Sequence, residues 1–138
     1  MNKTTTIILV LIMASLVYFS AGCKKDDGPD TVEYQMQVDT VTHTDTITVG
    51  ELFEITFYGP IGPNDCYSFS RFVPEFGLQS MSFTLYGIQE KRDDCAGSPK
   101  YMNGGTIGIE ELTAGEWNII VNEPEGITPL NSTLYVKE

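Results

Sequence analysis

The sequence predicts an all-β protein, a single immunoglobulin-like β-sandwich of about seven or eight strands over residues 31–138. Hydrophobic and polar residues alternate through most of this segment, which is typical of half-buried strands. Clusters of Gly, Pro, Asn and Asp separate the alternating runs, and no run carries a convincing helical period. A small barrel is the alternative architecture.

The expected strands follow one another along the chain. In the first, Val32, Tyr34, Met36 and Val38 share one face. The others are expected within residues 39–48, 53–58, 67–70, 81–86, 107–109, 117–122 and 134–136. Turns or loops are expected at residues 59–60, 62–65, 97–99, 103–105 and 124–126, and an irregular turn at 72–76 around Pro74.

The chain before these strands has the pattern of an export signal. Lys3 supplies a positive charge, an apolar run of 13 residues follows from Ile7 to Phe19, and small residues lead into Cys23. A cysteine in the first mature position is the mark of a bacterial lipoprotein, so residues 1–22 are expected to be a signal peptide and Cys23 the lipidation site. An uncleaved transmembrane helix is the weaker alternative, because a span needs about 20 mostly apolar residues.

Residues 23–30 are expected to be the lipidated cysteine and a polar, flexible tether. The run Lys24-Lys25-Asp26-Asp27 resembles the tether that follows the lipid cysteine in surface lipoproteins of Bacteroidetes. This resemblance implies an outer-membrane location, lipid-anchored and facing outward, with the membrane as a partner through the N-terminal lipid. Residues 48–55 and 112–121 resemble two strand openings of bacterial immunoglobulin-like domains, and the resemblance covers residues 31–138 in outline.

The net charge and the cysteine content indicate which binding partners and which cellular compartment to expect. The chain has a net charge of −11, and removal of residues 1–22 takes away Lys3 and leaves −12. Such a chain repels nucleic acid, so no nucleic-acid partner is expected. With Cys23 lipidated, Cys66 and Cys95 have only each other, and a structural disulfide is expected in an oxidising compartment.

The segment of residues 39–48 has an unusual composition. Every even position is threonine, and His43 and Asp45 share the opposite face of the expected strand. A metal or proton-transfer role for this pair is one interpretation. Zinc needs three or four such ligands and His43 is the only histidine, so we expect no metal and no cofactor. An edge strand kept soluble by its threonines is the favoured interpretation.

Three tripeptides resemble the acceptor that Bacteroidetes use for O-glycosylation of exported proteins, an aspartate followed by threonine or serine and a small apolar residue. They are Asp30-Thr31-Val32, Asp39-Thr40-Val41 and Asp45-Thr46-Ile47. The resemblance implies Thr31, Thr40 and Thr46 as possible acceptors, with Thr31 the first choice.

These observations favour a non-enzymatic binding or structural module, with no catalytic residues and with a protein or glycan partner. The loops expected at residues 59–65 and 90–105 are the candidate contact sites, and the second is favoured because it is long, charged and pinned by Cys95. The alternative is a small hydrolase, or an accessory subunit of a surface enzyme complex, with His43 and an aspartate in its site. The fold alone does not choose between these classes.

Overall fold

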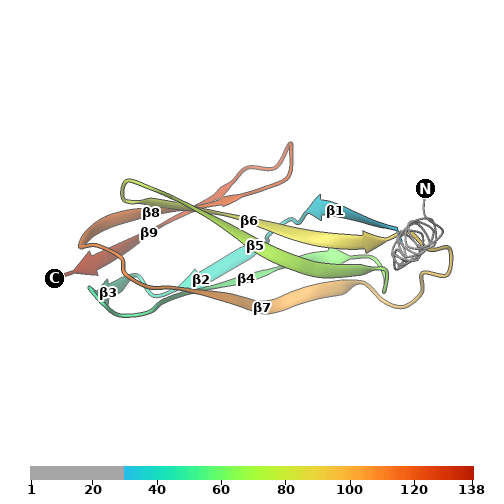
Figure 1. Ribbon diagram of the computed structural model, residues 1–138, viewed down its shortest axis with the longest axis horizontal. Coiled ribbons are helices and arrows are strands. Elements are labelled where there is room, and N and C mark those ends of the chain that lie inside the picture. The colour runs from blue at the N-terminus through green and yellow to red at the C-terminus, as the bar shows by residue number, and fades with distance from the viewer. Residues whose placement is uncertain (1–29) are drawn as a thin grey trace, which may run out of the picture.

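The computed structural model describes residues 30–138, which form two β-sheets and no helix (Figure 1). The predicted all-β sandwich is therefore confirmed. The strands within this part of the chain are β1 (Thr31–Gln35), β2 (Thr40–His43), β3 (Thr46–Thr48), β4 (Phe53–Gly62), β5 (Tyr67–Gly77), β6 (Ser80–Glu90), β7 (Lys100–Ile109), β8 (Gly115–Asn122) and β9 (Leu130–Lys137).

The larger sheet contains six strands and the smaller sheet has the order β2-β4-β7. In the larger sheet, β5 pairs with one edge of β6. The other edge of β6 is shared: its first half pairs with β8 in parallel, and its second half pairs with β1 antiparallel. β9 then pairs with β8, and β3 pairs with β9 in parallel. Because the sheets of antibody domains are antiparallel, the β6–β8 pair separates this strand order from theirs.

The core lies between the two sheets and is built by the predicted alternation. Phe53, Ile55 and Phe57 on β4 are completely buried and face the residues of the larger sheet. Their partners from β6, β8 and β9 are Met81, Phe83, Leu85, Trp117, Ile119, Val121, Leu134 and Val136. Each large apolar side chain removed from water in this way contributes about 1.5–3 kcal/mol to folding. None of the buried side chains in residues 30–138 is polar or charged.

The region of residues 31–48 forms three strands where two were expected, which raises the strand count of residues 30–138 to nine. β2 pairs with β4 in the smaller sheet, and β3 pairs with β9 in the larger one. The chain therefore changes sheets between His43 and Thr46. The backbone carbonyl of Asp45 accepts a hydrogen bond of 2.9 Å from the Tyr135 amide. This bond attaches the chain to β9 directly before β3 begins.

The turn expected at residues 72–76 is wrong, because this segment lies inside β5. Pro74 is accommodated because β5 is an edge strand that pairs only with β6. The turn expected at Gly59-Pro60 is likewise part of β4. β2 begins at Thr40, opposite Tyr58, so its pairing with β4 does not reach Pro60, and the missing amide hydrogen of Pro60 leaves no bond of that pairing unmade.

The loop expected at Asn103-Gly104-Gly105 is also wrong, because these residues form a bulge within β7. Tyr58 of β4 lies opposite Asn103, while the preceding Phe57 lies opposite Gly105. The extra residue is Gly104, whose φ of 101° lies in the region that glycine adopts without steric cost. The glycine pair that suggests a turn in the sequence is thus used to kink a strand.

Candidate functional site

One end of the sandwich lies beside Asp30, the first described residue, and the other end lies away from it. The backbone amide of Lys91 donates a hydrogen bond of 2.7 Å to the carbonyl of Asp30, so the chain enters beside the β6–β7 loop. We call this the tether end; it comprises residues 63–66 and 91–99. The opposite, distal end comprises residues 49–50, 78–79 and 111–114, and Figure 1 shows the C-terminus of β9 at that end.

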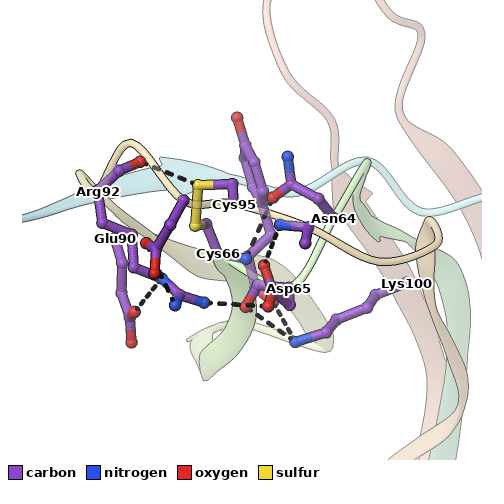
Figure 2. Close-up of a disulfide and its surroundings, with 10 residues drawn as sticks. Asn64, Asp65, Cys66, Glu90, Arg92, Cys95 and Lys100 are labelled. Carbon is purple, nitrogen blue, oxygen red and sulfur yellow. Dashed lines mark hydrogen bonds and ion pairs between the residues drawn. A yellow bond between two sulfur atoms is a disulfide. The ribbon is translucent and has the colours of Figure 1, made fainter.

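The tether end carries the predicted disulfide. Cys66, immediately before β5, is bonded to Cys95 in the β6–β7 loop, with their Cα atoms 5.5 Å apart (Figure 2). Cys66 is almost completely buried, whereas Cys95 is half-buried. The pairing of the two cysteines is therefore confirmed, and it attaches the β6–β7 loop to the start of β5.

Asp65 holds the same loop through its backbone and its carboxylate. Its amide donates to the Ala96 carbonyl and its Oδ1 accepts from the Ala96 amide, both at 2.9 Å. Arg92 lies 3.2 Å from the Asp65 carboxylate (Figure 2). The pKa of Asp65 lies below its usual value. The larger cause is the hydrogen bond from the Ala96 amide to its carboxylate, and the smaller is the nearby Arg92 guanidinium, because both stabilise the ionised form.

Two cations complete this cluster. Arg92 also lies 3.2 Å from Glu90 and 3.5 Å from Asp94. The Lys100 ammonium donates hydrogen bonds to the backbone carbonyls of Asp65 and Tyr67, at 3.2 and 3.1 Å. The loop is consequently fixed by a covalent bond, backbone hydrogen bonds and ion pairs, so it is a preorganised surface.

The loops predicted as contact sites are shorter than expected. Residues 59–62 belong to β4 and residues 100–105 to β7, which leaves residues 63–66 and 91–99 as connections. Both connections lie at the tether end. A partner that used them would approach the domain on the side from which the chain enters.

The three threonines of the acceptor tripeptides are all exposed. Thr31 is the first residue of β1, Thr40 begins β2 opposite Tyr58, and Thr46 begins β3 beside Tyr135. Thr31 is thus paired within the larger sheet, opposite Glu90 of β6. Modification of these hydroxyls remains a prediction.

His43 is held by its neighbours. Its Nδ1 donates to the Thr44 carbonyl at 2.9 Å, and its Nε2 lies within hydrogen-bond distance, 2.8 Å, of the Ser132 hydroxyl. The ring also packs edge-on against Phe53. Asp45 is exposed and shares no hydrogen bond with His43 in the described structure. Within residues 30–138, no group of three or more His, Cys, Asp or Glu side chains is arranged to hold a metal ion.

The distal end carries an apolar groove with a volume of about 700 Å³, which no pattern in the sequence predicts. Three separate parts of the chain form it: the β3–β4 turn, the β7–β8 connection and the end of the chain after β9. Its lining residues are Val49, Gly50, Glu111, Leu112, Thr113, Ala114 and Glu138. Only the fold brings these segments together, so no local pattern in the sequence signals the groove.

The predicted signal peptide at 1–22, the predicted lipidation site Cys23 and all but the last residue of the predicted tether lie outside the described residues. Across residues 30–138, the structure contains no helix with the length and hydrophobicity to cross a membrane. Comparison of the chain with protein-family models, with curated proteins and with solved structures finds no match. Fold and site therefore define the class, a disulfide-bonded two-sheet β-sandwich with a rigid loop cluster at one end and a groove at the other.

Proposed function

We propose that this protein is a non-enzymatic binding or structural module held at the outer membrane by a lipid on Cys23. The observation that carries the proposal is the Cys66–Cys95 disulfide, because such bonds persist in oxidising, extracytoplasmic compartments. It agrees with the export signal that precedes Cys23 in the sequence. A lipid with two or more acyl chains anchors a protein stably.

The tether length and the position of Asp30 determine how such an anchor presents the domain. Seven residues, 24–30, separate Cys23 from β1 and span at most about 25 Å when extended. Because Asp30 is bonded to Lys91, the tether end faces the bilayer and the distal end points away from it. The disulfide-pinned loop then lies on the membrane side, where it braces the domain or contacts a membrane-associated protein or glycan.

The surroundings of His43 bear on the alternative, a small hydrolase with His43 and an aspartate in its site. The Nδ1 of His43 is bonded to the Thr44 carbonyl and its Nε2 to the Ser132 hydroxyl, and Asp45 shares no hydrogen bond with it in the described structure. The predicted pair of His43 and Asp45 is therefore not formed, which favours the non-enzymatic proposal over this alternative. His43 instead links the edge of the smaller sheet to β9.

Fractionation of cells that express the full chain tests the anchor. We expect the protein in the membrane fraction, labelled by an alkyne fatty acid supplied to the cells. The variant Cys23→Ser should lose the label, while the double variant Cys66→Ser/Cys95→Ser, which also removes thiols, should keep it. Equal labelling of all three proteins, or none, contradicts the anchor.

A further inference from the structure

The apolar groove at the distal end presents hydrophobic surface to solvent. Leu112 forms its buried floor with 5% of its surface exposed, whereas Val49 on the wall is 49% exposed. Gln79, at the β5–β6 turn, donates a hydrogen bond of 3.3 Å to the carbonyl of Ala114, another lining residue. Leu78, next to Gln79, is 98% exposed. The β5–β6 turn thus adjoins the groove through Gln79, and exposed apolar surface at such a site is typical of an interaction surface.

The rim of the groove is acidic. Glu111 and Glu138 both line it, and neither takes part in an ion pair within residues 30–138. Glu111 has a φ of 61°, an uncommon conformation for a residue other than glycine. Directly after it, Leu112 is buried in the groove floor, so this turn sets a carboxylate beside an apolar floor.

The positive charges of the domain lie mostly at the other end. Of the five Lys and Arg residues in the described part of the chain, Lys91 and Arg92 belong to the tether end, and Lys100 begins β7 directly after it. Arg71, on β5, is paired with Glu33. Lys137, at the end of β9, is the one basic residue within two positions of the groove lining. The groove therefore attracts cations and repels other acidic surfaces.

We infer that the groove binds an extended segment of a partner protein in which an apolar side chain is flanked by lysine or arginine. The apolar side chain covers Val49 and Leu112, and the flanking cations pair with Glu111 and Glu138. Complementary charge steers the encounter and fixes the orientation, while burial of the apolar side chain supplies most of the affinity. An acidic partner and an anionic lipid surface are both repelled by the rim.

This inference names the partner of the binding module proposed above, and it rests on that proposal only for the outward direction of the groove. The test uses the full chain, purified in detergent and immobilised, and a phage-displayed library of random peptides. We expect enrichment of peptides with Leu, Ile, Val, Met or Phe beside Lys or Arg. Their binding should weaken as salt concentration rises.

Variants at the groove locate the bound peptides. Val49→Lys places a cation on the apolar wall and should weaken binding about tenfold or more. The double variant Glu111→Gln/Glu138→Gln should weaken it about two- to fivefold. The matched control Ile127→Lys, at a similarly exposed apolar residue in the β8–β9 loop, should leave binding unchanged.

Several outcomes overturn the inference. They are no enrichment over a detergent blank, enriched peptides without cations, and binding that Val49→Lys leaves intact. Sedimentation that reveals a dimer dissociated by Val49→Lys also overturns it, because the groove is then filled by a second copy. If the protein is acylated but enriches no peptides, the proposed groove partner is refuted and the lipid anchor is not. If peptides are enriched but Cys23 is not acylated, the lipid anchor is refuted and the groove partner is not.

Discussion

Removal of the Cys66–Cys95 disulfide should lower the free energy of unfolding by about 3–4 kcal/mol. The two cysteines are 29 positions apart, and closing a loop of this length in the unfolded chain corresponds to about 3.6 kcal/mol in the chain-entropy model. The ion pairs of Arg92 and the hydrogen bonds between Asp65 and Ala96 do not replace this restriction of the unfolded chain's entropy. They exist only in the folded state and leave the unfolded chain unconstrained.

Urea denaturation of Cys66→Ala/Cys95→Ala and of the parent protein measures the effect. A domain of this size should also lose roughly 4 °C in melting temperature for each kcal/mol. A reducing agent should destabilise the parent protein by a similar amount and leave the variant unchanged. A difference below about 1 kcal/mol between the two proteins refutes the chain-entropy reasoning. An unchanged parent protein in reductant shows that the bridge is absent.

Three further predictions concern single residues. Gly59→Ala should cost about 1–3 kcal/mol in urea denaturation, because a Cβ there overlaps the backbone carbonyl of Gln37; an unchanged midpoint contradicts this. The lowered pKa of Asp65 means that its stabilising effect is present at neutral pH and is lost as pH falls below its usual range near 4. Asp65→Asn should therefore flatten the acid side of the profile of melting temperature against pH, and an unaltered profile counts against it. Burial raises the pKa of Glu123, so the stability of the domain falls as pH rises and this carboxyl ionises. Glu123→Gln should therefore melt at a higher temperature than the parent protein at pH 7 and at the same temperature below about pH 4; a lower melting temperature at pH 7 argues against this.

The parts of the fold that depend on local patterns could be predicted from the sequence. Alternation at period two placed Phe53, Ile55 and Phe57 on one buried face. Only two cysteines were left after Cys23, which fixed their pairing. Both inferences require no knowledge of which strands are neighbours.

The predictions failed where the position of a strand in its sheet decides the outcome. Pro74 is acceptable within β5 only because that strand is an edge, and the run at 103–105 forms a bulge only because β4 lies opposite. The groove joins Val49, Leu112 and Glu138, which are far apart in the sequence. These features result from long-range pairing, which a single sequence does not encode in any local window.

The mass of the mature N-terminal peptide, from protein extracted out of the membrane fraction, tests the proposed anchor most directly. The account predicts that the peptide begins at Cys23, with a diacylglyceryl group on the sulfur and a further acyl chain on the amine. A mature chain that retains residues 1–22, or that has an unmodified Cys23 thiol, contradicts it.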